Sequence, residues 1–595
     1  MDTRRVALGA VFVCCLACST VILAGLPIAH GTGTALPDRS AERATAKPAV
    51  NATELACPPR AGEATATVSA TRRHSRIVGL YPNPTTDGNV GEFVVLETPP
   101  DTRLANLTLT DGETTASLPN QTTTGRVALS TAPNVTETLT DLRVLELEGR
   151  LKLSADGDAL RLRNATTTID MVSYNRAPTA ERWYRTRARA GETVSARGQW
   201  WPRDATCLPV SSATIDDATA FVLPDAPHIP RETIRSADNR LLLAGYTVTS
   251  ETIATDLVAA AERGVDVTVL FEASPVGGTP APTEAVIETL ETGGVDVRVI
   301  GGEHGRYRYH HPKYAVADDR VLVTTENWKP AGVGGESSRG WGVRFESEAL
   351  ANDLATVFWA DFEGRDTTTG TAYLETASFV DDGTDDIRSP AQSEFPTTHE
   401  PSTVSVESAE LLVAPDNAEQ RLTDLLATAD DELLVLQPSV AADVSLLEPT
   451  IEAARRGVEV RILLGSTWYN ADENERLAAD LERLAAREAL PLEVQLVGDT
   501  DRFGKLHAKG IVIDREVVVV GSANWNSNSL GNNREVLVAL YGEEIASYYA
   551  AVFEADWEGT RWRIPIGLSA AFAAALVAVA IAGRRYIRFG ESPGV

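Results

Sequence analysis

Two segments of the chain repeat a histidine and a lysine at the same spacing. His311 is followed two residues later by Lys313, and His507 is followed in the same way by Lys509. Side chains at positions i and i+2 of a strand lie on the same face, so each imidazole and its ammonium should point the same way. The chain has only six lysines among its 54 basic residues. A lysine kept in such a chain indicates that the site needs a compact ammonium.

Two histidines and two lysines in one site could cleave a phosphodiester. A neutral histidine can attack phosphorus through Nε2 when a partner holds its Nδ1–H, and a second, protonated histidine can give a proton to the leaving alkoxide. The second histidine would then activate water, or an acceptor alcohol, to resolve the phosphohistidine. The lysines and nearby polar side chains would hold the non-bridging oxygens. This scheme needs no cofactor, and the sequence has no pattern typical of a metal site.

Each motif leads into a predicted β-hairpin that brings further polar side chains back to it. In the second segment the strand turns near Asp514, returns through residues 517–520 and ends in GSANW. The first segment turns near Asp318 and ends in TTENW. The predicted phosphate-binding side chains are Ser522, Asn524, Thr325 and Asn327. Aspartate is favoured in turns for local backbone bonding, so a structural role is expected for Asp318 and Asp514.

The two motifs belong to a longer internal repeat. AAERGVDVTVL at 260–270 matches AARRGVEVRIL at 453–463, and VFWADFEG at 357–364 matches VFEADWEG at 552–559. Each repeat alternates predicted helices with apolar strands, for example a helix over 250–263. This alternation predicts an α/β sandwich with a largely parallel sheet. Two such halves meeting on a pseudo-twofold axis would combine both motifs in one active site.

This pair of motifs resembles the phospholipase D superfamily. The second copy has H-x-K-x(4)-D at His507, Lys509 and Asp514, then GSANW and the N-x-E motif that ends at Glu535. It matches the family pattern in full. In that family the glutamate of N-x-E typically orients a catalytic histidine, so the resemblance implies this role for Glu535. The resemblance covers both repeats and implies a metal-independent phosphodiesterase or phosphatidyl transferase.

The first copy departs from the family pattern. Aligning the repeats places Trp341 where Glu535 stands, so one histidine is expected to lack its usual orienting carboxylate. Family precedent implies that the N-terminal histidine, His311, is the nucleophile, whereas the complete second motif favours His507. We assign His311 as nucleophile and His507 as acid, and keep the reverse order as the alternative. Residues beside the first motif could contact substrate or be loop residues, namely His304, Arg306, Arg308 and His310.

The segment before the repeats is different in kind. Short alternating strands separated by Asp-Gly turns predict an all-β sandwich over 71–207. Its stretches YPNP, GEFVVLE, LTDG, LSADGDALRL and IDMVSYN resemble a lamin-tail domain, an immunoglobulin-like fold. This resemblance implies a binding or spacer module of unknown ligand. Cys57 and Cys207 bracket the segment and are predicted to form a disulfide. Five sequons predict glycosylation, at Asn51, Asn106, Asn120, Asn134 and Asn164.

Apolar segments near both ends predict a membrane protein. Residues 1–30 are typical of a signal peptide or signal anchor. Residues 564–583 are uncharged, apolar and long enough to span a bilayer. Arginines in 584–595 predict that this tail is cytoplasmic. We therefore expect a cell-membrane protein with one C-terminal span and its catalytic domain outside the cell.

The remaining predicted parts are a flexible stalk at 31–70, a first phospholipase D-like repeat at 225–364, a linker at 365–405 and a second repeat at 406–560. The chain has 83 acidic and 54 basic residues, a net charge of −29. So acidic a surface favours a halophilic protein and disfavours tight non-specific binding to nucleic acid.

The predicted function is cleavage of phosphodiesters, with phospholipid headgroups as the leading substrate. The alternatives are an extracellular nuclease, a phosphatidyl transferase similar to cardiolipin synthases, and an inactive binding or scaffold protein with the same fold. The histidine and lysine kept in both copies argue against the inactive scaffold.

Overall fold

The computed structural model describes residues 74–559, with gaps at 85, 141, 180, 186–197, 203–205, 207, 303–304, 365 and 381–394. Several predictions concern parts outside these residues. They are the signal segment at 1–30, the stalk, the pair Cys57 and Cys207, and the tail at 584–595.

The predicted localisation needs correction. Within the described part of the chain, no helix is both long enough and apolar enough to cross a membrane. The prediction of a single C-terminal span is therefore not supported. It rested on the length and hydropathy of residues 564–583, which lie outside the described residues.

Two β-sheets make up the N-terminal domain. The first has the strand order β11 (Gly198–Pro202), β10 (Glu181–Arg185), β1 (Arg76–Tyr81), β2 (Phe93–Arg103), β5 (Thr122–Ser130) and β6 (Val144–Glu146). The second has the order β7 (Glu148–Arg150), β4 (Thr115–Ser117), β3 (Thr108–Thr110), β8 (Asp158–Arg163) and β9 (Thr168–Tyr174). A 3₁₀ turn, Asp87–Asn89, and the short helix α1, Pro133–Leu139, connect strands. A core that includes Leu96, Leu109 and Leu160 is shared by both sheets, which is the layering of a β-sandwich. The resemblance to a lamin-tail domain stays a prediction.

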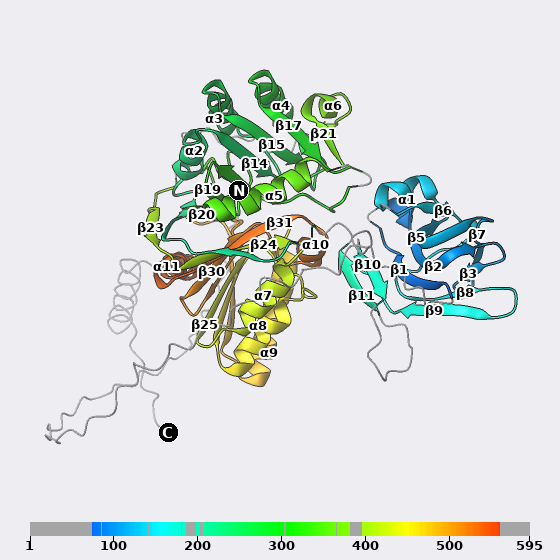
Figure 1. Cartoon of the computed structure of the whole chain (residues 1–595). Helices are drawn as coiled ribbons and strands as arrows, with labels where there is room; N and C mark the ends of the chain where they lie inside the picture. The colour runs from blue at the N-terminus through cyan, green and yellow to red at the C-terminus, as the bar shows by residue number, and fades with distance from the viewer. Residues whose placement is uncertain are drawn as a thin grey trace, which may run out of the picture. The chain divides into compact units, whose positions relative to one another are not determined.

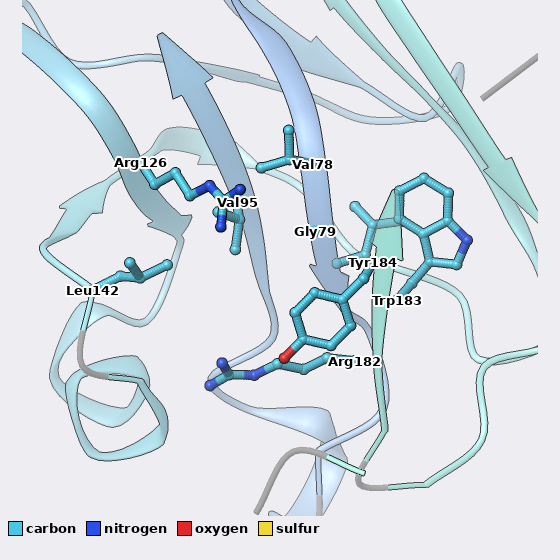
Figure 2. Close-up of a pocket in the computed structure, with 9 residues that line it drawn as sticks. Val78, Gly79, Val95, Arg126, Leu142, Arg182, Trp183 and Tyr184 are labelled. Atoms are coloured by element: carbon cyan, nitrogen blue, oxygen red, sulfur yellow. The ribbon is translucent and has the colours of Figure 1, made fainter. Parts of the chain in front are cut away.

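A small pocket lies on this β domain. Figure 2 shows its lining, which comes from β1, β2, β5, β10 and the segment after α1. Its volume is about 20 Å³, which is room for roughly one water molecule. None of its lining residues belongs to the histidine–lysine motifs.

The first α/β half runs from β13 to α5, residues 217–362, and is called the first half below. Its sheet has the strand order β17 (Asp296–Ile300), β15 (Asp266–Glu272), β14 (Arg240–Gly245), β18 (Tyr314–Ala317), β19 (Arg320–Thr324), β20 (Ser338–Glu346) and β13 (Asp217–Leu223). Its helices are α2 (His228–Arg235), α3 (Glu251–Glu262), α4 (Pro282–Thr292) and α5 (Glu348–Phe362). β14, β15 and β17 are parallel, and the remaining pairs are antiparallel.

The second half runs from β24 to α11, residues 408–559, and repeats this order. Its sheet has the order β27 (Leu492–Val497), β26 (Glu459–Gly465), β25 (Glu432–Gln437), β29 (Gly510–Ile513), β30 (Val517–Gly521), β31 (Glu535–Tyr541) and β24 (Ser408–Ala414). Its helices are α7 (Ala418–Ala427), α8 (Leu447–Arg456), α9 (Ala471–Glu488), α10 (Ser527–Gly531) and α11 (Glu543–Gly559). The duplicated α/β fold that the sequence predicted is thus confirmed.

The repeated Arg-Gly pair ends the same helix in both halves. Gly264 follows α3 with φ +93°, and Gly457 caps α8 with φ +100°. A left-handed residue after a helix is best supplied by glycine, which has no Cβ to clash. The chain then enters β15 or β26, so this glycine fixes where a helix stops and a parallel strand begins.

The two halves share one apolar core. A single buried cluster includes Trp341 of the first half and Tyr549 of the second, whose rings lie 4.7 Å apart. Each half has a separate cluster on its outer side, under α2–α4 in one half and α7–α9 in the other. Figure 1 shows these helices on the outer faces of the two sheets. Because the inner layer is common, the halves are positioned against each other by packing rather than by a linker.

The predicted linker and its surroundings contribute further elements. β21 (Thr367–Thr369) pairs with β17, and β23 (Ser402–Ser405) pairs with β13. α6 (Gly370–Leu374) follows β21, and β22 (Phe379–Val380) pairs with β16 (Thr279–Pro280). β12 (Ser211–Ala213) joins the edge of the second sheet beside β24.

Candidate active site

Each motif histidine is held by a backbone strand of the other half. The His311 amide donates to the carbonyl of Arg534, and the His507 amide donates to the carbonyl of Arg339, both at 2.9 Å. β28 (Lys505–Leu506), just before His507, also pairs with β20 of the first half. The halves therefore exchange contacts reciprocally, which brings both motifs to the boundary between them.

The two motif lysines lie in matching positions. The Lys313 ammonium donates to the carbonyl of His311, and that of Lys509 donates to the carbonyl of His507, the latter at 2.6 Å. Both side chains are buried. Burial lowers the pKa of Lys509 to about 7 and holds the pKa of Lys313 well below its usual value. A bound phosphate would stabilise the charged form of both ammonium groups.

A buried carboxylate of the second half holds His311. Glu535 lies 2.9 and 3.0 Å from His311 Nδ1 through its two oxygens. The same carboxylate accepts hydrogen bonds from the Ser522 hydroxyl at 2.5 Å and the Asn533 amide at 3.0 Å. A proton on Nδ1 satisfies this arrangement and leaves the lone pair of Nε2 free. Burial alone would raise the pKa of Glu535, but its interactions with His311 and Lys313 lower it overall.

His507 also has a carboxylate partner, which corrects the expectation that one histidine lacks it. The partner is Glu326, whose Oε2 lies 3.2 Å from His507 Nδ1. Glu326 belongs to the first half and follows β19. This distance is longer than those between Glu535 and His311, and Glu326 Oε1 has no hydrogen-bond partner. His507 is therefore held less firmly than His311.

Strand register identifies the residue of the first half that is equivalent to Glu535, and it differs from the one that the alignment of the repeats gave. Thr324 pairs with Gly342 across β19 and β20, and Gly521 pairs with Leu537 across β30 and β31. Since Thr324 and Gly521 are equivalent, the structural counterpart of Glu535 is Gly340. The alignment of Trp341 with Glu535 was wrong by one residue. It was made from the sequence alone, without the pairing of β19 with β20 and of β30 with β31.

Trp341 is a core residue with a tightly fitted neighbour. It is fully buried, and a Cβ added to Gly510 would lie 2.2 Å from its ring. Gly510 follows the second motif directly, so the absence of a side chain there leaves the room that Trp341 fills.

Glu326 occupies the space that a side chain at Gly340 would need. A Cβ built on Gly340 would lie 2.2 Å from Glu326 Cγ. In the second half the situation is reversed, because Ala523 stands where Glu326 does and Glu535 stands where Gly340 does. The first half thus supplies its carboxylate from the end of β19 instead of the start of the next strand. The signal in the sequence was a glutamate in TTENW where the second copy has an alanine in GSANW.

The pKa of both motif histidines is lowered, which favours the neutral imidazole before substrate binds. Burial lowers the pKa of His311 to about 4, with Glu535 opposing this and Lys313 adding to it. Burial and the charge of Lys509 lower the pKa of His507 to about 3, with Glu326 opposing. Burial alone would raise the pKa of Glu326, but His507 and Lys509 lower it to about 2. A negatively charged phosphodiester would favour protonation of one imidazole.

The predicted phosphate-binding residues differ in their partners and burial. The Ser522 hydroxyl is committed to Glu535, and the Thr325 hydroxyl accepts from the Trp341 amide at 3.0 Å. Both side chains are fully buried. Asn327 follows Glu326 and has a buried side-chain oxygen without a partner. Asn524 follows Ala523 and is partly exposed.

The two motif aspartates make equivalent turn contacts. Asp318 accepts from the amides of residues 238–240 at 2.8–3.0 Å. Asp514 accepts from the amides of residues 430–432, with shortest distances of 2.8–3.0 Å. These bonds tie each hairpin to the start of the neighbouring parallel strand, which supports the predicted structural role.

Several residues beside the first motif have structural partners. Arg306 pairs with Asp366 at 2.7 Å, and His310 Nε2 lies 3.4 Å from Asp361, which also pairs with Arg534. Arg308 stacks over the ring of Tyr309, and His304 lies outside the described residues. Trp328 and Trp525 are buried, as packing residues would be.

One aromatic residue of the site was not predicted. The Tyr246 ring lies edge-on to the His311 ring, with centroids 4.5 Å apart, and the Lys313 ammonium lies 5.1 Å from its centroid. Tyr246 follows β14, and nothing in the motif spacing pointed to it. Within the described residues, no group of three or more His, Cys, Asp or Glu side chains is arranged to hold a metal.

The chain matches one family profile in both halves. The family is described as "Cardiolipin synthase, PLD-like domain", and the matched residues are 231–362 and 422–557. Similar characterised proteins include cardiolipin synthase A of Pseudomonas aeruginosa, 29% identical over 134 residues, or 22% of this chain and 26% of the relative. Mouse mitochondrial cardiolipin hydrolase is 32% identical over 104 residues, or 18% of this chain and 42% of the relative. The matches thus span about a quarter of the cardiolipin synthases and under half of the hydrolase.

Solved structures with a similar arrangement were also found. Phosphatidylserine synthase of Haemophilus influenzae has a TM-score of 0.45 and 16% identity, covering 58% of this chain and 87% of that one. The phospholipase D family member Nuc of Salmonella typhimurium has a TM-score of 0.23 and 20% identity, covering 27% of this chain and 97% of that one.

Proposed function

Because the chain belongs to the phospholipase D superfamily, we propose that it cleaves phosphodiesters of phospholipids through a phosphohistidine intermediate. The membership confirms the family predicted from the two repeated motifs, and the predicted enzyme class agrees with the relatives. The observation that carries the proposal is the reciprocal pairing of each motif histidine with a buried carboxylate of the other half. Such a pair fixes the imidazole tautomer and leaves Nε2 available for chemistry.

The first step forms a bond between His311 Nε2 and phosphorus. Glu535 holds the Nδ1 proton and stabilises the positive charge that develops on the ring. As this bond forms, the bond from phosphorus to the leaving alcohol's oxygen breaks. Protonated His507 gives its proton to that oxygen and becomes neutral.

The second step reverses the roles. Neutral His507 takes a proton from water, whose oxygen attacks phosphorus, and the P–N bond to His311 breaks. The product is a phosphomonoester, and His507 is again protonated. Throughout both steps the ammonium groups of Lys313 and Lys509 balance the charge on the non-bridging oxygens.

The difference in support of the two histidines favours His311 as the nucleophile. Its Nδ1 lies within hydrogen-bonding distance of both oxygens of Glu535, so its ring orientation is fixed before substrate binds. A nucleophile needs an accurate line of attack, because small misplacement is costly. A proton donor can tolerate the looser contact that His507 makes with Glu326.

Phospholipid is favoured over nucleic acid as the substrate. The relatives are, by name, a cardiolipin synthase and a cardiolipin hydrolase. The net charge of −29 opposes binding of an extended polyanion. A second candidate reaction is phosphatidyl transfer, in which an acceptor alcohol replaces water in the second step. The cardiolipin synthase profile favours this candidate.

The test is an assay of the full chain on phosphatidylcholine vesicles, single-stranded DNA and a chromogenic diester. It compares wild type with His311→Ala and His507→Ala, at high salt, with and without glycerol as an acceptor. We expect wild type to release the headgroup from lipid and both variants to fail. A glycerol-dependent phosphatidyl product would identify the transferase. An inactive wild type across all substrates would overturn the proposal in favour of a scaffold.

A further inference from the structure

Two exposed apolar loop tips occupy equivalent positions in the two halves. One follows β15 and includes Val276, which is 74% exposed. The other follows β26 and includes Trp468 and Tyr469, which are 89% and 52% exposed. In the described part of the chain, the other exposed large apolar side chains are Val90 and Met171, both in the β domain. The exposed apolar side chains of the α/β halves are therefore concentrated on these two tips.

Both tips lie at the sheet edge that carries the motif histidines. In the first half, Ala244 near the end of β14 pairs with Tyr314, one residue after Lys313, and β15 ends beside β14. In the second half, Leu436 pairs with Gly510, one residue after Lys509, and β26 ends beside β25. The segments that leave β15 and β26 thus start at the edge where the two motifs lie.

Direct contacts link the first tip to the candidate site. The Val276 amide donates to the Tyr246 hydroxyl at 2.5 Å, and the ring of Tyr246 packs against His311. One partly buried side chain, that of Tyr246, therefore separates the exposed valine from the proposed nucleophile.

The second tip is fastened to its sheet edge in a similar way. The Asn470 side chain donates to the Pro438 carbonyl at 3.3 Å, just beyond β25. Asn474 donates to the same carbonyl and to that of Gly465, at 2.8 and 2.7 Å. Trp468 and Tyr469 pack edge to face, 5.5 Å apart, on this anchored segment. Both rings are exposed although hydrogen bonds of Asn470 and Asn474 hold the segment beside them in place. Their exposure therefore follows from the fold.

The chemistry of the tips fits a lipid surface. Residues 273–281 and 466–471 contain no charged side chain, and the next residues on the second tip are Asp472 and Glu473. A nucleic-acid strand would need cations here, and the acidic pair would repel it. Tryptophan and tyrosine favour the boundary between headgroups and acyl chains, where an apolar ring and a polar edge are both satisfied.

We propose that the tips around Val276 and Trp468–Tyr469 dock the enzyme on a zwitterionic lipid surface and so present headgroups to the two histidines. The inference rests on the proposed function, because it names the surface on which that site would act. Insertion of the rings would remove exposed apolar area from water. It would do so without drawing on electrostatic attraction, so docking should persist at high salt.

The experiment compares the full chain with a Trp468→Ser/Tyr469→Ser variant. Two readouts are reaction rates, one on phosphatidylcholine vesicles and one on a water-soluble chromogenic diester. The third is binding, measured by vesicle flotation. We expect the affinity for vesicles, measured by flotation, to fall by at least about tenfold. The vesicle rate at subsaturating lipid should fall by the same factor. The rate on the soluble diester should be unchanged. Trp468→Phe should keep most vesicle activity, because it keeps an apolar ring.

A Val90→Ser/Met171→Ser variant is the matched control, since it removes the exposed large apolar side chains of the β domain. It should leave both rates unchanged. Equal loss on both substrates, no loss on vesicles, or a selective loss of DNA cleavage in the tip variant would overturn the inference. If wild type cleaves nothing but the tip variant still loses flotation, the proposed function fails and the docking surface stands.

Discussion

The two α/β halves place a carboxylate beside the other half's histidine by two different routes. In the second half Glu535 begins β31, and Ala523 stands at the position equivalent to Glu326. In the first half Glu326 follows β19, and Gly340 leaves the space. Both carboxylates are buried, and both meet a histidine Nδ1 from the opposite half. The location of the charge is the same, although the residue that supplies it differs.

This difference shows that the site requires a charge at a point in space and not a glutamate at a point in the motif. It also leaves the halves unequal. Glu535 is held by Ser522 and Asn533 as well as by His311, whereas Glu326 has an oxygen without a hydrogen-bond partner. The firmer arrangement orients the proposed nucleophile, and the looser one faces the proposed acid.

Removing the carboxylates should give the largest effect and separate the two halves. We expect Glu535→Ala to reduce kcat by about 10³-fold and Glu326→Ala by about 10²-fold, within the range of general acid–base contributions. The order follows from the fixed line of attack that Glu535 gives to His311. The measurement is steady-state kinetics on the chromogenic diester and on lipid. A larger loss in the Glu326 variant would reverse the assignment of nucleophile and acid.

Leaving groups offer a second readout for the same variants. A diester whose alcohol leaves without a proton should be less sensitive to Glu326→Ala than a lipid substrate, because the acid step is then dispensable. Glu535→Ala should slow both substrates alike. Equal sensitivity of both variants to the leaving group would mean that the halves do not have distinct roles.

A relocation variant sharpens the comparison further. Glu326→Ala/Gly340→Glu copies the second half's arrangement into the first half. The alanine removes the side chain that a residue at position 340 would strike. We expect this variant to recover about tenfold in kcat over Glu326→Ala, since general acid catalysis regains its partner. Gly340→Glu alone should instead destabilise the protein, because Glu326 still fills the space. No recovery in the double variant would show that the position along the chain matters.

The pH dependence of stability should give a smaller effect that reports on both histidines. Their pKa values fall to about 4 for His311 and about 3 for His507, from 6.5 in the unfolded chain. Between pH 6.5 and about 4 the unfolded chain binds protons that the folded protein does not, so stability falls as pH falls. The expected slope is about 1.4 kcal/mol per pH unit for each histidine.

Urea unfolding across this pH window is the measurement. His311→Gln and His507→Gln should each reduce the slope by one histidine's share, and the double variant should reduce it by both. Slopes that stay parallel to wild type would contradict the buried neutral state of these two residues.

Much of the fold followed from the sequence, since the duplicated segments alternate helices and apolar strands with the same glycine after α3 and α8. The family resemblance also predicted that Glu535 orients a catalytic histidine, but not that this histidine would be His311 of the other half. Glu326 did not follow, because the pairing of β19 with β20 decides which side chain fills the space over Gly340. Tyr246 was missed for a similar reason, since it follows β14 and is far in sequence from either motif. The membrane span was inferred from hydropathy alone, and no described helix supports it.

The central claim is that His311 is the nucleophile and His507 the acid and base of one shared site. It is tested most directly by trapping the intermediate in His507→Ala with a chromogenic diester, then mapping the phosphorylated residue by mass spectrometry at alkaline pH. The account predicts one burst of leaving group per chain and phosphate on His311, with no trapped phosphate in His311→Ala. Phosphate on His507 in the His311→Ala variant, or no protein-bound phosphate in any active form, would contradict it.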